Sequence, residues 1–195
     1  MSQTLKINEI FYSIQGEGAR AGEPSIFIRL SGCDLTCGFC DTEFKSGKDM
    51  TLPELRQYIS RWPCRWIVWT GGEPMLQLDE ATIEYFKECG YKQACESNGN
   101  HKIPRQLDWI VVSPKVAEHV LARKNPDGVD ELRYVRHAGQ MSVPEPAIAA
   151  KHYYLSPIFD GQVPNRENVK HCMELILANP KWKLSLQLHK LIGVL

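Results

Sequence analysis

The 195-residue sequence lacks an excess of charge of either sign, because 23 lysines and arginines balance 23 aspartates and glutamates. Proteins that bind nucleic acids or anionic membranes through general electrostatics carry a basic excess. The balance therefore argues against both classes of partner, although a local basic patch would not show in the total.

Long hydrophobic runs are also missing. No run approaches the roughly 20 apolar residues that a membrane-spanning helix needs, and the first ten residues, MSQTLKINEI, lack the apolar core of a secretory signal. We therefore expect a cytoplasmic protein without membrane association. With 43% hydrophobic and 24% charged residues, the composition is ordinary for a globular protein. Neither repeats nor linkers interrupt the chain, so we expect a single domain over residues 1–195.

Runs of β-favouring residues alternate with helical patterns. The predicted strands cover residues 25–30, 65–70, 93–97, 109–112, 131–136 and 152–155. The predicted helices cover residues 52–59, 79–89 and 168–178, and Thr51 with Glu54 forms a capping box at the start of the first. Strands separated by helices predict right-handed βαβ units and a mostly parallel sheet. Because a full eight-unit barrel needs ~250 residues, we expect an α/β fold with an incomplete, TIM-like barrel and a reduced helical layer.

Cysteine, by contrast, is plentiful, with seven residues. In a reducing compartment, cysteines are metal ligands, core residues or reactive thiols more often than disulfide partners. Cys64, Cys89, Cys95 and Cys172 are scattered along the chain, and we expect them to be small buried hydrophobic side chains.

The other three cysteines, Cys33, Cys37 and Cys40, follow the predicted strand 25–30 with the spacing Cys-x3-Cys-x2-Cys. A 4Fe–4S cluster normally takes four cysteines, so three would leave one iron with an open position, as catalytic zinc sites do. An open iron can bind a substrate or a cofactor. A structural zinc site completed by a histidine or a distant cysteine, and a loop without any metal, remain alternatives on the spacing alone.

A second motif, Thr70-Gly71-Gly72-Glu73-Pro74, follows the predicted strand 65–70. Two glycines let the backbone approach a ligand closely, and Glu73 can accept a charge-assisted hydrogen bond from an ammonium group. Alone, the motif is read most simply as a turn that ends a strand. After the cysteine loop, at the carboxyl edge where parallel sheets bind ligands, it favours a cofactor site.

The two motifs together resemble the radical S-adenosylmethionine superfamily. Further segments follow one another over nearly the whole chain: 10–18 (IFYSIQGEG), Gly22, Pro24, 27–30, 40–42 (CDT), 70–74, 96–99 (ESNG), 113–115 (SPK), 155–157 (LSP) and 184–190 (LSLQLHK). In this order, they resemble one family of the superfamily, 7-carboxy-7-deazaguanine synthase.

This resemblance implies a lyase of queuosine and deazapurine biosynthesis. The substrate of the family is 6-carboxy-5,6,7,8-tetrahydropterin, and the product, formed with loss of ammonia, is 7-carboxy-7-deazaguanine. A 5′-deoxyadenosyl radical abstracts hydrogen from the pterin, whose ring then contracts. The implied cofactors are one 4Fe–4S cluster per subunit, S-adenosylmethionine and Mg²⁺. A homodimer and a reducing partner such as a flavodoxin are also implied.

The resemblance further implies a role for individual residues. The cluster ligands are Cys33, Cys37 and Cys40, and Thr42 offers Mg²⁺ a hard oxygen ligand. The positions implied for cofactor binding are Phe39, Asp41, Gly72, Glu73, Ser113, Lys115, Tyr154, Leu155, Ser156 and Pro157. The positions implied for substrate binding are Ile14, Gln15, Gly16, Glu17, Arg29, Thr70 and Leu195. Arg29 suits a carboxylate, and an ionised Glu17 suits the donors of an aminopyrimidine.

Two features of the C-terminus give the resemblance less support. The chain ends in Gly193-Val194-Leu195, where members of the family often end in proline. His189 is interpreted as a packed histidine rather than a ligand.

Two other functions compete with this interpretation. A glycyl-radical-enzyme activase would share the cysteine spacing, but the Ser-Ile-Gln-Gly-Glu-Gly and Cys-Asp-Thr stretches argue against it. A non-catalytic iron–sulfur or zinc module would have no use for the Gly-Gly-Glu turn.

Overall fold

The computed structural model describes residues 3–38, 40 and 42–194. The chain forms two compact units. Unit 1 is built from the described parts of Met1–Ser13, Pro24–Ser97 and Lys102–Ile110, and unit 2 from the described parts of Ile14–Glu23, Asn98–His101 and Val111–Leu195. Each unit is therefore assembled from three separate stretches of the sequence. The prediction of a single domain stays a prediction.

Unit 1 contains strands in the order β5-β4-β2-β1-β3. Their bounds are β1 (Thr4–Ile14), β2 (Pro24–Leu30), β3 (Lys48–Thr51), β4 (Trp66–Gly71) and β5 (Lys92–Ser97). β2 pairs in parallel with β4, and β4 with β5, whereas β3 pairs antiparallel with β1. Because parallel neighbours end at the same edge, the loops that follow β2, β4 and β5 emerge together.

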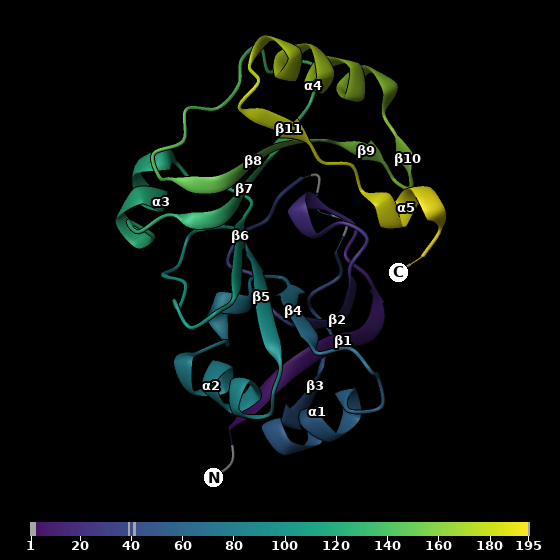
Figure 1. The fold of residues 1–195 in the computed structure, drawn as a ribbon, viewed down its shortest axis with the longest axis vertical. Coiled ribbons are helices and arrows are strands. Elements are labelled where there is room, and N and C mark those ends of the chain that lie inside the picture. The colour runs from purple at the N-terminus through teal and green to yellow at the C-terminus, as the bar shows by residue number, and fades with distance from the viewer. Residues whose placement is uncertain (1–2, 39, 41, 195) are drawn as a thin grey trace. The chain divides into compact units, whose positions relative to one another are not determined.

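Unit 1 has two α-helices, α1 (Leu52–Ile59) and α2 (Glu80–Glu88) (Figure 1). α1 has the predicted bounds. The Thr51–Glu54 capping box is present in full, which confirms that prediction. The Asp79 side chain accepts a hydrogen bond from the Thr82 amide at 2.8 Å, so Asp79 caps α2 rather than beginning it. A short 3₁₀ helix, η2 (Pro74–Leu76), lies between them.

Unit 2 contains strands in the order β11-β8-β7-β6. Their bounds are β6 (Trp109–Val112), of which Val111 and Val112 belong to this unit, β7 (Val129–Arg136), β8 (Ala150–Pro157) and β11 (Trp182–Leu184). All of these pairs are parallel. A small antiparallel pair, β9 (Phe159–Asp160) and β10 (Val163–Pro164), is separate from them.

The helices of unit 2 are η1 (Gly18–Arg20), α3 (Glu118–Lys124), α4 (Arg166–Ala178) and α5 (Leu188–Ile192). α4 packs against β8 and β11 (Figure 1). It begins two residues earlier than predicted because the Asn165 side chain accepts a hydrogen bond from the Asn168 amide at 3.0 Å and so caps the helix. Residues 98–108, all of them described, form no helix, which agrees with the thin helical layer expected from the sequence.

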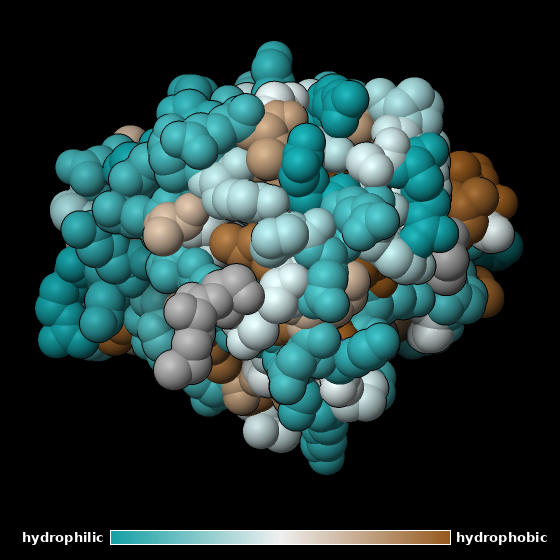
Figure 2. Space-filling model, turned by 90° about the horizontal axis from the view of Figure 1, so that it is seen from below, coloured by the Kyte–Doolittle hydropathy of each residue, from teal (hydrophilic) through white to brown (hydrophobic). Residues whose placement is uncertain are grey.

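The predicted core cysteines are largely where expected. Cys64, Cys95 and Cys172 are buried, but Cys89 is half-buried because it caps the C-terminus of α2. The face of the molecule drawn in Figure 2 is mainly hydrophilic, with hydrophobic side chains in small separate groups. Among the described residues, no helix is both long and apolar enough to span a membrane.

Candidate active site

The cysteine loop begins where β2 ends. Gly32 has a φ of +93°, a conformation that favours glycine, and its amide donates to the Phe44 carbonyl at 2.7 Å, so the two ends of the loop meet. Cys33 and Cys37 are half-buried and Cys40 is exposed, and all three are free thiols. The Cys40 amide donates to the Cys37 carbonyl at 3.1 Å, which keeps these two cysteines one turn apart.

The segment after the last cysteine is fixed by the Glu43 carboxylate. Its Oε1 accepts the amides of Lys45 and Ser46 at 2.6 and 3.0 Å, and its Oε2 accepts the Ser46 hydroxyl at 2.6 Å and the Asn8 amide group at 2.7 Å. These hydrogen bonds, led by that of the Ser46 side chain, lower the pKa of Glu43 to about 2.

Arg29 and Thr42, two of the predicted site residues, lie together. The Arg29 Nη1 is 3.4 Å from the Thr42 hydroxyl oxygen. The guanidinium also lies 3.1 Å from a Glu9 carboxylate oxygen and 5.4 Å from the centre of the Phe11 ring. A cation and a hard oxygen side by side are suited to a carboxylate shared with Mg²⁺.

The Gly-Gly-Glu turn packs against the start of the cysteine loop. The Glu73 amide donates to the Gly32 carbonyl at 2.8 Å. A side-chain carbon added at Gly72 would collide with the Gly32 carbonyl oxygen and reach the Cys33 Cβ at 3.0 Å. Glycine is therefore required at Gly72 by close backbone packing. Thr70, a predicted substrate-binding residue that begins this motif, is half-buried in β4.

The Glu73 side chain is fully buried. Its Oε1 accepts the Ser97 hydroxyl at 2.9 Å and the Met75 amide at 3.0 Å. Ser97 ends β5, so two neighbouring parallel strands contribute to one polar cluster at their carboxyl ends. A buried carboxylate with neutral donors is suited to bind a cation such as an ammonium group.

The residues of unit 1 fit an open iron–sulfur cluster by their chemistry. The three free thiols lie on one short loop, next to a buried carboxylate turn. Burial raises the pKa of the Cys33 thiol, so a metal that binds the thiolate would offset an unfavourable environment for its charge. Among the described residues, no three cysteine, histidine, aspartate or glutamate side chains are yet gathered around one point.

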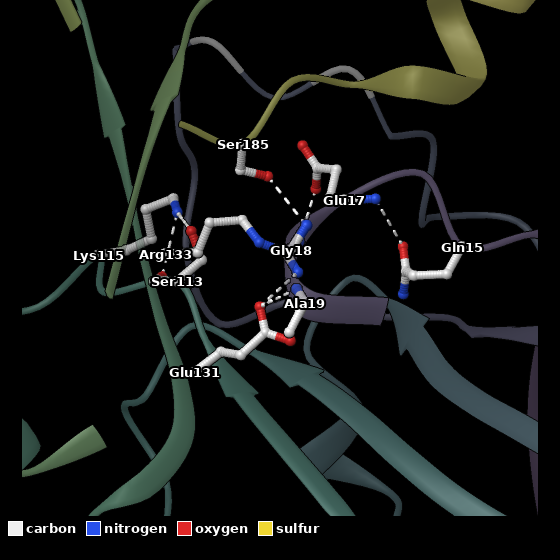
Figure 3. Close-up of polar contacts among 9 residues, drawn as sticks. All are labelled: Gln15, Glu17, Gly18, Ala19, Ser113, Lys115, Glu131, Arg133 and Ser185. Atoms are coloured by element: carbon white, nitrogen blue, oxygen red, sulfur yellow. Dashed lines mark hydrogen bonds and ion pairs between the residues drawn. The ribbon is translucent and has the colours of Figure 1, made fainter. Parts of the chain in front are cut away.

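In unit 2, the predicted residue Glu17 belongs to a network of charges (Figure 3). Glu17 Oε2 lies 2.6 Å from Nη1 of Arg133, and Arg133 Nη2 lies 3.5 Å from Oε2 of Glu131. The Glu17 amide donates to the Gln15 side-chain oxygen at 3.1 Å. The Gly18 amide donates to the Ser185 hydroxyl at 3.0 Å.

The residues on either side of Glu17 are also fixed. The Leu188 amide donates to the Gly16 carbonyl at 2.9 Å. A side-chain carbon added at Gly16 would collide with the His189 ring, which agrees with His189 as a packed histidine. Ile14 is half-buried at the end of β1.

Ser113 and Lys115 follow β6, as the resemblance implies (Figure 3). The Lys115 ammonium donates to the Ser113 hydroxyl at 2.5 Å and to its carbonyl at 3.1 Å. The two side chains therefore form one polar group at the carboxyl end of β6.

The predicted segment Tyr154–Pro157 alternates along β8, so its members point to opposite faces of the sheet. Tyr154 and Ser156 share a face with Arg133, the register partner of Tyr154. The Ser156 hydroxyl is buried, and no described residue forms a hydrogen bond with it. Leu155 and Pro157 point to the other face, and the Leu155 carbonyl accepts the Ser185 amide at 3.0 Å.

Three predicted site residues, Phe39, Asp41 and Leu195, lie outside the described residues. Sequence analysis missed Arg133, Glu131 and Ser185. The first two carried a signal, because charges at alternate positions of a predicted strand occupy one face of it. Ser185 lies in the matching segment 184–190, but its contact with Gly18 could not be predicted, since the two are 167 residues apart.

Parallel strands that lead into a three-cysteine loop and a Gly-Gly-Glu turn define the class of radical S-adenosylmethionine enzymes. The 7-carboxy-7-deazaguanine synthase of Bacteroides thetaiotaomicron is 39% identical over 189 residues, which cover 97% of this chain and 98% of that protein. The synthase of Haemophilus influenzae is 38% identical over 198 residues, covering 97% and 94%. The chain belongs to the 7-carboxy-7-deazaguanine synthase family, which confirms the predicted family and enzyme class.

Among solved structures, QueE from Escherichia coli matches with a TM-score of 0.76 and 24% identity, over 95% of both chains. This match confirms the predicted α/β fold with a mostly parallel sheet and few helices, and it is consistent with an incomplete barrel. No family model matches the chain.

Proposed function

We propose that the protein converts 6-carboxy-5,6,7,8-tetrahydropterin to 7-carboxy-7-deazaguanine with loss of ammonia, as a lyase of queuosine or deazapurine biosynthesis. The observation that carries the proposal is the packing of the Gly-Gly-Glu turn on the cysteine loop, where Glu73 contacts Gly32, one residue before Cys33. The relatives support it, because they bear this activity in their name and match this chain from end to end.

In this proposal, Cys33, Cys37 and Cys40 hold one 4Fe–4S cluster per subunit, and Glu73 holds the ammonium of S-adenosylmethionine. When bound, the cluster supplies the electron that cleaves the cofactor to a hydrogen-abstracting radical. Ser97 and Met75 donate to one oxygen of Glu73, which orients the carboxylate.

The other positions proposed to bind S-adenosylmethionine offer hydroxyl and ammonium groups in place of a carboxylate. Ser113 and Lys115 offer a hydroxyl and an ammonium from the end of β6, and Tyr154 and Ser156 offer hydroxyls from β8. Gly72 allows close approach of the backbone. The resemblance adds Phe39, Asp41, Leu155 and Pro157 to this set.

For the substrate, Arg29 binds the carboxylate, and Thr42 contributes a hydroxyl ligand to a Mg²⁺ ion that shares that carboxylate. The 3.4 Å separation of the two groups supports this pairing. Glu17 accepts hydrogen bonds from the aminopyrimidine edge. The resemblance adds Ile14, Gln15, Gly16, Thr70 and the C-terminal Leu195.

We further propose that the protein is cytoplasmic, folds as one catalytic domain, acts as a homodimer and receives its electron from a flavodoxin-like reductant. The homodimer and the reductant rest on the resemblance, whereas the location and the single domain rest on the sequence composition and the lack of linkers. They do not affect the assay that follows.

The test is anaerobic incubation of reconstituted protein with the carboxytetrahydropterin, S-adenosylmethionine, reductant and Mg²⁺, with mass detection of the deazapurine. We expect the product together with 5′-deoxyadenosine, and about four irons per chain. Zinc in place of iron would contradict the cluster. Cleavage of S-adenosylmethionine without formation of a deazapurine would contradict the proposed substrate, and transfer of a radical to a glycine of another protein would establish an activase instead.

Thr42→Ala should weaken the response of turnover to Mg²⁺. An unchanged response would reject the role of Thr42 as a Mg²⁺ ligand.

A further inference from the structure

Two charged side chains, Glu131 and Arg133, lie on one face of β7 inside unit 2. Their side chains are only 1% and 5% exposed. Removing charges from water is costly unless each is paired and hydrogen-bonded. Such a pair, on a strand face that it shares with Val129 and Val135, is therefore expected to serve a purpose other than stability.

The Arg133 guanidinium links two carboxylates. Its Nη1 contacts Glu17 at 2.6 Å, and its Nη2 contacts Glu131 at 3.5 Å (Figure 3). A planar guanidinium presents these nitrogens in a fixed geometry, whereas a lysine ammonium is a single point of charge. The position of Glu17 Oε2 is thus determined by a side chain that is itself anchored on β7.

Glu131 also holds the backbone that follows Glu17. Its Oε2 accepts the Ala19 amide at 3.3 Å. It lies so close to Gly18 that an added side-chain carbon there would collide with it. On the other side, the Ser185 hydroxyl accepts the Gly18 amide. The carboxylate and the peptide groups after it are therefore both fixed.

We propose that Arg133 and Glu131 are positioning residues that fix the Glu17 carboxylate for recognition of an aminopyrimidine edge. This inference rests on the proposed function. An ionised carboxylate accepts about four hydrogen bonds, so the contact with Arg133 leaves it able to receive the two adjacent N–H groups of that edge. Recognition of two donors side by side depends on the orientation of the carboxylate plane, which Arg133 sets.

The decisive variant is Arg133→Lys, which keeps the charge and loses the fork that reaches both carboxylates. We expect the KM for the pterin to rise about tenfold, the scale of one charge-assisted hydrogen bond, with kcat within about twofold. Formation of 5′-deoxyadenosine without substrate should stay unchanged. Lys151→Gln is the matched control, because the exposed Lys151 on β8 forms an ion pair with Asp130 on β7 that involves neither Glu17 nor Arg133. An unchanged KM in Arg133→Lys would overturn the inference.

A second measurement separates positioning from general damage to the fold. Glu17→Gln leaves Arg133 paired with Glu131 and should raise KM by itself. If Arg133 acts through Glu17, adding Arg133→Lys to Glu17→Gln should change KM by less than about twofold. If the two substitutions raise KM independently, so that their effects multiply in the double variant, the inference is overturned. It is also overturned if Arg133→Lys reduces cleavage of S-adenosylmethionine without substrate as much as it impairs turnover of the pterin.

A substrate analogue without the 2-amino group gives a third readout. The wild-type protein should discriminate against it, and Arg133→Lys should discriminate less. Product formation by the wild-type protein also separates a failure of the proposed function from a failure of the positioning role alone. If the wild-type protein forms no deazapurine, the proposed function fails. If it does, and the Arg133 variant keeps the wild-type KM and discrimination, only the positioning role fails.

Discussion

The cysteine loop of unit 1 and the Glu17 loop of unit 2, residues 14–23, are held in opposite ways. The cysteine loop is fixed at its two ends, by the contact between Gly32 and Phe44 and by the Glu43 cluster, while its thiols are half-buried or exposed. The Glu17 loop is fixed at the side chain proposed to act, through the 2.6 Å contact with Arg133.

This difference follows from the chemistry of the ligands. A metal cluster forms strong bonds in all directions and gathers its own ligands when it binds, so the loop needs only correct spacing. A pterin is recognised by hydrogen bonds, which weaken steeply with poor geometry. The protein must therefore fix the acceptor in advance.

The largest effect expected from this comparison is that of Cys33→Ala, Cys37→Ala or Cys40→Ala. Each removes a proposed cluster ligand, so reductive cleavage of S-adenosylmethionine should fall to background, as measured by 5′-deoxyadenosine. Because the Glu17 side chain and the Gly18 amide contact residues of unit 2, the stability of unit 2 to proteolysis should be unchanged. Retained cleavage in any variant would remove that cysteine from the ligand set.

Gly72→Ala should have the next largest effect, because the new methyl group collides with backbone at Gly32 rather than with a flexible side chain. We expect the free energy of unfolding of the apoprotein to fall by about 1–3 kcal/mol, as overpacking typically does. Denaturant unfolding of Gly38→Ala is the control, since a methyl group there meets no described atom within 4 Å. Equal stability of the two variants would show that the turn does not pack closely on the loop.

Ser185→Ala should have a smaller effect on the other loop. The Gly18 amide loses its acceptor, which should lower the free energy of unfolding by about 1 kcal/mol. The KM for the pterin should rise modestly. Ser60→Ala, which removes an exposed hydrogen bond at the end of α1, is the control and should change stability by no more than about 0.5 kcal/mol. A loss in Ser60→Ala as large as in Ser185→Ala would argue against a specific role for Ser185.

The smallest effect concerns pH and the exposed Glu43. Its folded pKa of about 2 lies below the ordinary value of 4.5. Its contribution to stability is therefore present above pH 4.5 and is lost as the pH falls towards 2. Glu43→Gln should reduce the dependence of the urea midpoint on pH across this window. Identical pH profiles for the variant and the wild type would contradict the role of Glu43.

Much of the fold could be predicted from local signals. Thr51 with Glu54, and Asp79, locate the starts of α1 and α2 because capping depends on neighbouring residues only. β1 was missed although Leu5, Ile7 and Phe11 are buried, because the exposed Glu9 interrupts the alternation. α3 was missed because a seven-residue helix with one buried side chain, Leu121, has too little periodicity to detect.

The candidate site was predictable where its residues are close in sequence. In unit 1, the spacing of the three cysteines and the Gly-Gly-Glu motif predicted most of the candidate site. The support for Glu17 could not be predicted, because Arg133 lies 116 residues away and only the folded chain brings the two together. The contact of Thr42 with Arg29 is an intermediate case, since 13 residues and one loop separate them.

The Gly18–Ser185 hydrogen bond has a consequence for the order of folding. The chain is synthesised from its N-terminus, so Gly18 emerges early, whereas Ser185 comes 167 residues later. Contacts across such a separation form late, because closing the long loop costs conformational entropy first. The segment proposed to recognise the substrate is thus among the first made on the ribosome and among the last to become ordered. Until Ser185 has been translated, a nascent chain can have every cysteine of its cysteine loop and still lack the acceptor for the Gly18 amide.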